Sequence, residues 1–228
     1  MSNFQTPEEL AAAVEEGTKR TYFVGLDLGQ SHDYTALSVI ERVEVPILHL
    51  GHRAPAPVQW SKGFHVRHLQ RLPLGLSYPA IVARVGLVCK TAPLYRNHKL
   101  IVDQTGVGRP VFDMFKLAKL APIGITITGG DNWSREASDH YRVSKGILVS
   151  RLQADLHSGE LGIAEALPEG AVLRSELADF QMAHTATGYQ TFNARSGRHD
   201  DLVLSVAVAL WFAKAVGDQR MQKARTRL

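Results

Sequence analysis

Four aspartates lie within or beside apolar segments of this 228-residue chain. Asp27 has a leucine on either side of it, and Asp103 directly follows the apolar residues 100–102. Asp200 and Asp201 stand together at the start of a long apolar stretch. Burying an ionised carboxylate is costly unless a cation or a hydrogen-bond donor compensates its charge. Three such positions in one chain therefore suggest a shared partner, a divalent metal ion.

The available side chains narrow the choice of metal. Carboxylate oxygens suit Mg²⁺ or Mn²⁺ rather than zinc. The single cysteine, Cys89, excludes a disulfide framework and a Cys-rich zinc site. Two ions about 4 Å apart, bridged by one carboxylate, would activate a water and stabilise the leaving oxygen of a phosphodiester. We expect Gly25 and Gly29, which flank Asp27, to let a nucleic-acid backbone approach closely.

Each aspartate also has an ordinary structural explanation. Asp103 would serve as a turn or cap residue at a strand end, and Asp200 or Asp201 as a helix N-cap. Asp27 has no capping role in the middle of a strand, and two consecutive aspartates exceed what one cap requires. The metal-site interpretation therefore depends most strongly on Asp27.

Hydrophobic patterns predict the elements that position these aspartates. Buried strands are predicted at 22–28, 35–41, 45–51, 100–103, 123–128 and 189–192, the first three forming an antiparallel meander. Helices are predicted at 7–17, from 77, from 110, at 143–157, at 169–180 and from 199 onward. The last helix is apolar nearly all round, so it should be buried against the sheet. Residues 53–73 are expected to form a loop rich in proline and basic residues.

The order of these elements predicts the fold class. Three meander strands followed by alternating helices and strands indicate one α/β domain, a mixed sheet flanked by helices. We expect a helical extension over 1–20, the main domain over 21–217 and a basic flexible tail over 218–228. The chain has no apolar run of about 20 residues and no signal-peptide pattern, so we expect a cytoplasmic protein without membrane contact.

The basic residues are distributed unevenly. The formal net charge is only +4, but positions 45–102, 58 residues in all, contain no acidic residue. A surface of one sign favours a polyanion, and nucleic acid is the commonest. We therefore expect DNA contacts from the first four basic residues of this stretch, Arg53, Lys62, Arg67 and Arg71. The alternative is a solvated face whose counter-charges come from elsewhere in the fold.

Three acidic motifs occur in order along the chain: GLDLGQSHDYTA at 25–36, IVDQTGVG at 101–108 and GRHDDLVLS at 197–205. Together they resemble the C-terminal nuclease domain of large terminase subunits from tailed bacteriophages, an RNase H-like fold. The resemblance extends over about residues 20–215. It implies that Asp27 bridges two metal ions and that Asp103 is the second acid. The third acid falls at Asp200 or Asp201, and we favour Asp201.

The resemblance also implies supporting residues and a function. His199 would orient water or touch phosphate, Lys145 would contact the scissile strand, and Asp33 would lie beside the ligands. Each also has an ordinary explanation as a surface or capping residue, which is at least as strong. The implied activity is a metal-dependent endonuclease that uses Mg²⁺ or Mn²⁺ to cut double-stranded DNA during viral genome packaging in the host cytoplasm. The implied partners are a terminase ATPase, a small terminase subunit and a portal.

One departure from that family concerns its ATPase motor. The chain has no Gly-x-x-x-x-Gly-Lys-Ser/Thr loop, because Gly106-Val-Gly-Arg109 lacks the lysine. We therefore expect a nuclease domain separated from its motor, or a separately encoded nuclease, with no translocation activity of its own. Two other functions stay open. One is a different RNase H-like nuclease, such as a junction resolvase or an RNA–DNA hybrid nuclease, and the other is a non-catalytic nucleic-acid- or nucleotide-binding module.

Overall fold

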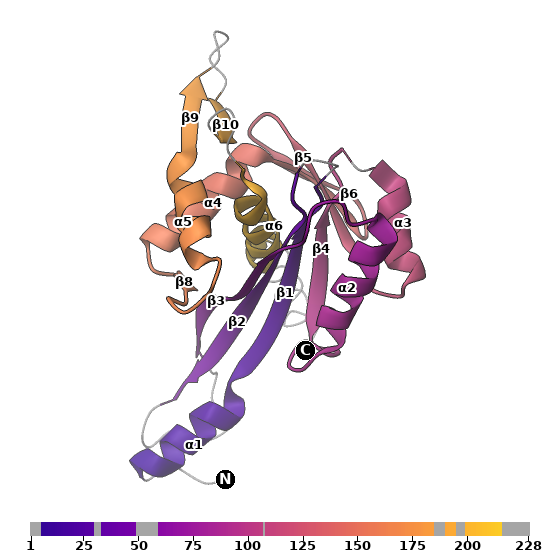
Figure 1. The fold of residues 1–228 in the computed structure, drawn as a ribbon. Coiled ribbons are helices and arrows are strands. Elements are labelled where there is room, and N and C mark those ends of the chain that lie inside the picture. Colours follow the sequence, from indigo (N-terminus) through magenta and orange to yellow (C-terminus); the bar gives the residue numbers. More distant parts are fainter. Residues whose placement is uncertain are drawn as a thin grey trace.

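A mixed β-sheet of eight strands, in the order β6-β7-β5-β4-β1-β2-β3-β8, forms the centre of the molecule (Figure 1). The computed structural model describes residues 6–29, 33–48, 59–106, 108–184, 190–194 and 199–215. The strands of the sheet are β1 (Lys19–Asp27), β2 (Ala36–Ile47), β3 (Gln59–Arg71), β4 (His98–Asp103), β5 (Ile123–Thr128), β6 (Trp133–Ala137), β7 (His140–Ser144) and β8 (Leu161–Ile163). The helices are α1 (Pro7–Gly17), α2 (Tyr78–Lys90), α3 (Gly108–Leu117), α4 (Lys145–His157), α5 (Gly170–Asp179) and α6 (Asp201–Ala215), and β9 (Phe180–His184) pairs with β10 (Gln190–Ala194) outside the sheet.

The pairing within the sheet confirms the predicted α/β fold class. Strands β1, β2 and β3 form an antiparallel meander. On its other side β1 pairs in parallel with β4, which continues in parallel to β5 and then to β7. Because β1 is both the first strand of the meander and the neighbour of the parallel half, residues at its end lie near the middle of the sheet.

The third strand of the meander differs from the prediction. Residues 45–47 continue β2, and β3 covers Gln59–Arg71, most of the segment expected to be a loop. Only alternate residues of β3, such as Phe64 and Val66, are buried, and a β-bulge opposite Val39 and Ile40 shifts the alternation. In a half-exposed strand whose alternation of buried and exposed residues is interrupted, the apolar pattern is weak. This explains why β3 was predicted to be a loop.

The polar segment before α4 also has more structure than expected. It forms the antiparallel hairpin of β6 and β7, and every residue of β6 is exposed. An edge strand without a buried face leaves no hydrophobic pattern for a prediction to detect. The predicted helix at 143–157 begins at Lys145, where the Ser144 side chain accepts a hydrogen bond from the Ile147 amide. Strands β8 and β9 were not predicted either.

Helix α6 packs directly against the centre of the sheet. Its residues 201–213 are all buried, as its uniform apolar sequence predicts. A Cβ atom on Gly25 would lie 1.9 Å from the Ser205 carbonyl oxygen and 2.9 Å from the Ala209 Cβ. At Gly29 a Cβ would lie 2.2 Å from the Asp33 carbonyl oxygen. Both glycines therefore accommodate the protein's own backbone, and the expectation that they admit a nucleic-acid backbone was wrong.

The two faces of the sheet have separate hydrophobic cores. One lies under α4, α5 and α6, and the other under α2 and α3. Helix α1 lies at the far end of the sheet (Figure 1), within the predicted extension, and begins with a capping box between Thr6 and Glu9. The predicted basic tail, 218–228, lies outside the described residues. Among the described helices, none has the length and apolar character that crossing a membrane requires.

Candidate metal centre

Asp27 and Asp103 end neighbouring parallel strands. They are register partners in the pairing of β1 with β4. Side chains alternate between the two faces of a strand, so Asp27 shares its face with Phe23, and Asp103 shares its face with Ile101. Phe23 and Ile101 both belong to the core under α6. The two aspartates therefore point to the α6 side of the sheet.

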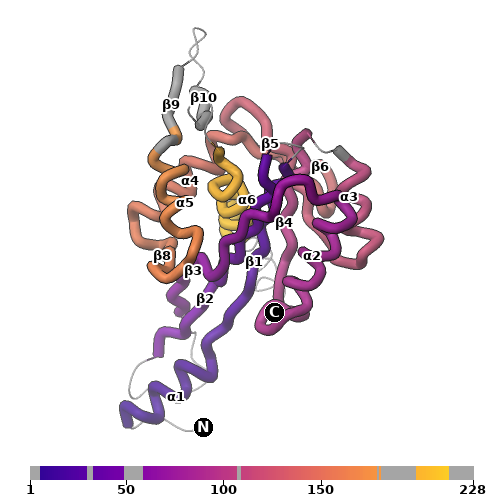
Figure 2. Tube along the Cα trace, in the orientation of Figure 1, coloured from indigo at the N-terminus to yellow at the C-terminus, as the bar shows by residue number. Residues whose placement is uncertain are grey.

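Asp201 reaches the same place from the helix. It is the first residue of α6, which starts at the end of the sheet where β1 and β4 finish (Figure 2). The backbone contact between Gly25 and Ser205, one turn into the helix, fixes this approach. The Asp201 side chain is buried, and among the described residues none gives its Oδ2 atom a hydrogen bond. Such an oxygen is expensive to bury, so the Asp201 carboxylate is suited to binding a cation.

Asp200 has a different environment from its neighbour. Its Oδ2 accepts a hydrogen bond of 2.7 Å from the Nζ atom of Lys145, the first residue of α4. The Asp200 side chain also keeps 23% of its surface exposed, against 9% for Asp201. A carboxylate that already has a cation partner gains less from a metal ion. The geometry thus favours Asp201 over Asp200 as the direct ligand.

The sequence analysis missed one carboxylate, Glu176 of α5. Its side chain is buried, and its Oε2 accepts a hydrogen bond of 3.0 Å from the Val203 amide in the first turn of α6. Its Oε1 accepts a short hydrogen bond from Arg71 Nη2. A detectable signal was present, because Glu176 lies one turn after Leu173 on the apolar face of a predicted helix.

The remaining predicted residues lie at the rim. His199 Nδ1 is 3.6 Å from Asp201 Oδ2, and the His199 side chain is 45% exposed. Its ring meets the ring of Tyr34 edge-on, with centroids 5.5 Å apart. Asp33 is exposed, and its charge contributes to raising the pKa of Asp201. Both residues therefore lie close to the aspartates without being part of the buried group.

The electrostatics of this group are strongly unfavourable for negative charge. Burial, together with the charges of Asp103, Asp201 and Asp200, holds the pKa of Asp27 well above its ordinary value. Burial raises the pKa of Asp103 to about 6, although hydrogen bonds to Thr105 and Asp27 oppose the shift. Burial likewise raises the pKa of Asp201 and brings that of Glu176 to about 7, against the charge of Arg71. A divalent cation would relieve this repulsion.

The donor set fits a divalent metal, although its side chains are not yet arranged around one. Within the described residues, no three His, Cys, Asp or Glu side chains are placed as a ready set of ligands. Lysine and arginine side chains instead pair with Asp200 and Glu176. Carboxylate oxygens, including the unbonded Asp201 Oδ2 atom, are the ligands that Mg²⁺ and Mn²⁺ prefer. Binding would therefore require these side chains to close on the ion.

The residues expected to contact DNA have carboxylate partners. Lys62 is the register partner of Glu44 and lies 4.0 Å from it, and Arg67 donates a 2.6 Å hydrogen bond to Glu41. Arg71 pairs with a carboxylate of the candidate metal centre. Arg53 lies outside the described residues. Two cations of the acid-free stretch thus have buried carboxylate partners, because antiparallel pairing sets β3 beside the acidic residues of β2.

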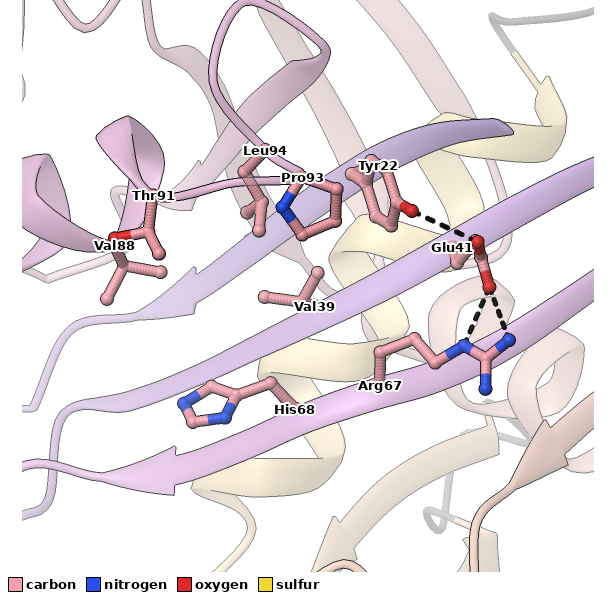
Figure 3. A pocket seen from close by; sticks show the side chains of 9 residues that line it. All are labelled: Tyr22, Val39, Glu41, Arg67, His68, Val88, Thr91, Pro93 and Leu94. Atoms are coloured by element: carbon pink, nitrogen blue, oxygen red, sulfur yellow. Dashed lines mark hydrogen bonds and ion pairs between the residues drawn. The ribbon is translucent and has the colours of Figure 1, made fainter. Parts of the chain in front are cut away.

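A cavity of about 520 Å³ lies away from these carboxylates. It opens between the end of α2 and the sheet, and Tyr22, Glu41 and Arg67 line its polar side (Figure 3). Tyr22 stands five residues before Asp27 on β1, about 16 Å along an extended strand. Its hydroxyl donates a hydrogen bond to Glu41, which also accepts from Arg67, so these polar groups satisfy one another. The cavity is therefore separate from the candidate metal centre.

Comparisons with known proteins identify the fold. No protein-family model matches the chain, and neither does any curated protein sequence. The large terminase nuclease from thermophilic phage G20c with bound magnesium aligns at 22% identity and a TM-score of 0.57, covering 84% of this chain and 80% of that one. The Thermus phage P74-26 large terminase nuclease domain aligns at 18% identity and a TM-score of 0.54, covering 85% and 80%. The chain has the fold of these nuclease domains, which confirms the resemblance at that level.

Proposed function

We propose that this chain is a metal-dependent endonuclease that hydrolyses phosphodiester bonds of double-stranded DNA, as in viral genome packaging. The observation that carries the proposal is the convergence of Asp27, Asp103 and Asp201 from two strands and a helix. The unbonded Asp201 Oδ2 atom, as judged among the described residues, supports the need for a cation. The fold shared with phage terminase nucleases, one of which has magnesium bound, supports the same reaction class.

In this proposal Asp27, Asp103 and Asp201 would hold two Mg²⁺ or Mn²⁺ ions. When bound, such ions activate a water and stabilise charge on the leaving oxygen. Asp200 remains with Lys145, whose ammonium group is half-buried and can face a phosphate. His199, exposed beside Asp201, is placed to orient water or phosphate at the rim.

The proposed substrate contacts predict low sequence selectivity. Contacts to phosphate position a nucleic acid but carry no base information. The proposed partners, a terminase ATPase, a small terminase subunit and a portal, would then determine where on the genome a cut is made. Cleavage of matched duplex, four-way junction and RNA–DNA hybrid substrates tests the assignment, and duplex DNA should be cut fastest.

Removing single carboxylates tests the reaction itself. We expect Asp27→Asn and Asp103→Asn to lower plasmid cleavage in Mg²⁺ or Mn²⁺ by more than the about 10- to 100-fold that loss of an outer metal partner costs. Plasmid relaxation followed on gels, together with a melting curve for each variant, measures the effect. Asp113→Asn on the exposed side of α3 is the matched control and should retain full activity. Undiminished cleavage by Asp27→Asn would contradict the proposal.

A further inference from the structure

Arg71 lies inside the candidate metal centre. It ends β3, and its register partner on β2 is Ala36, which in turn pairs with Asp27 on β1. Arg71, Ala36, Asp27 and Asp103 thus form one row across the sheet. Arg71 shares its strand face with Leu69, which belongs to the core under α6. The guanidinium group therefore projects toward the start of α6, and only 19% of the side chain is exposed.

The contacts of Arg71 are incomplete. Its Nη2 donates to Glu176, and the same atom lies 3.7 Å from Asp201 Oδ2, beyond hydrogen-bonding distance. Its Nε is buried and, within the described part of the chain, forms no hydrogen bond. The guanidinium also lies over the ring of Tyr34, 5.1 Å from the centroid. Among the described residues, the Arg71 Nε donor and the Asp201 Oδ2 acceptor are therefore both buried without a hydrogen bond, and the guanidinium group comes within 3.7 Å of that oxygen.

Glu176 connects Arg71 to the first turn of α6. One of its carboxylate oxygens accepts from Arg71, and the other accepts from the Val203 amide of α6. The Val203 amide is one of the N-terminal donors that a helix cannot satisfy internally. Glu176 is thus tied to the same helix turn that carries Asp201, so its position relative to Asp201 is fixed.

We propose that Arg71, held by Glu176, is a positioning residue that compensates the charge of Asp201 while the site lacks a metal and competes with the divalent ion for that carboxylate. This inference rests on the proposed metal centre and specifies how its affinity is set. Glu176 restrains the competition, because it draws the guanidinium away from Asp201 Oδ2. Metal binding then leaves the Arg71–Glu176 pair in place and releases only the contact with Asp201.

Substitutions at the two residues should change metal affinity in opposite directions. Arg71→Met removes the competing charge, so the Kd for Mn²⁺ measured by calorimetry should fall about tenfold, the order expected for one charge at this distance. The melting temperature of the metal-free variant should fall as well, because Glu176 and Asp201 lose their counter-ion. Glu176→Gln keeps an acceptor for the Val203 amide and frees Arg71 to bond Asp201, so its Kd should rise about tenfold.

The double variant separates this mechanism from a simple sum of charges. If Glu176 acts through Arg71, Glu176→Gln has little effect once Arg71 is methionine, and the double variant should bind Mn²⁺ like Arg71→Met. Additive charges would return the double variant to the wild-type Kd, and that result would overturn the inference. Arg67→Met is the matched control, since Arg67 pairs with buried Glu41 at the separate cavity (Figure 3). It should lower the melting temperature but leave the Kd unchanged.

The remaining outcomes are also decisive. An unchanged or weaker Mn²⁺ affinity in Arg71→Met, with a wild type that binds Mn²⁺ and cleaves DNA, would overturn the inference and leave the proposed function standing. A wild type that neither binds Mn²⁺ nor cleaves DNA would overturn both. If Arg71→Met does not fold, Glu176→Gln decides alone, because an unchanged Kd in that variant contradicts the restraint on Arg71.

Discussion

At the level of single residues, the candidate site concentrates negative charge that the described part of the protein only partly compensates. Lys145 neutralises Asp200 and Arg71 neutralises Glu176, while Asp27 and Asp103 share a hydrogen bond with each other. Two buried carboxyl groups in such contact cannot both be ionised without a cation. The site should therefore exchange protons for metal ions as the pH rises.

This exchange predicts the pH dependence of stability. The pKa values of Asp103 and Glu176 are raised to about 6 and about 7 in the folded, metal-free protein, above their ordinary values of 3.8 and 4.5. At pH values between the ordinary and the raised pKa of each group, the folded state binds more protons than the unfolded state. The free energy of unfolding should therefore fall as the pH rises from about 4 to about 7. At the proposed metal centre Mn²⁺ would bind the ionised carboxylates, so the rise in melting temperature that it causes should grow over the same window.

Melting curves at pH 5.0 and 7.5, with and without Mn²⁺, measure both effects. Asp103→Asn is the control, because it removes one titrating group and should make the metal-free stability less dependent on pH than in the wild type. A metal-induced shift that is equally large at both pH values would contradict this assignment.

At the level of elements, the crossing of α6 over β1 brings the third aspartate to the other two. The close contact at Gly25 is with a backbone carbonyl, which cannot move aside as a flexible side chain can. Among the elements that sequence patterns missed, β3 and the β6–β7 hairpin have exposed faces. Those that they predicted, α6 and β5 among them, are amphipathic or wholly apolar. Local sequence patterns thus identify an element when burial makes its residues apolar, either at regular intervals or throughout.

Gly25→Ala tests the role of the crossing. We expect the free energy of unfolding to fall by about 3 kcal/mol, the upper end for an overpacked core, because α6 must shift. Cleavage should fall too, since the shift moves Asp201 away from Asp27. Denaturant unfolding and the plasmid assay measure the two effects. Gly86→Ala in α2 is the control: its Cβ would lie 3.7 Å from Leu120, so stability should be unchanged or higher.

At the level of the whole molecule, the fold agrees with terminase nuclease domains, but the basic stretch of sequence is not a bare cationic surface. Lys62 and Arg67 face Glu44 and Glu41 on the neighbouring strand. A paired cation must give up its carboxylate before it can bind phosphate. DNA contacts should therefore come mainly from cations other than Lys62 and Arg67.

The salt dependence of DNA binding tests which cations contact the DNA. Each phosphate contact contributes about 0.9 to the slope of log affinity against log salt concentration. We expect duplex affinity to fall steeply with salt in the wild type, with the same slope in Lys62→Met and Arg67→Met. Fluorescence anisotropy of a labelled duplex at several salt concentrations measures the slope. A decrease of about one in the magnitude of this slope for each substitution would instead assign these two residues to the DNA interface.

The sequence by itself determined the α/β class, most of the buried elements and the aspartates at 27, 103 and 201, because an acidic residue among apolar neighbours is visible locally. Only the tertiary structure revealed Glu176 as a member of the site, moved Arg71 from a surface loop into it and paired Arg67 with Glu41. Each of these depends on which distant segments lie side by side. Strand register and helix crossing determine that, and both arise from packing of the whole chain rather than from any local pattern.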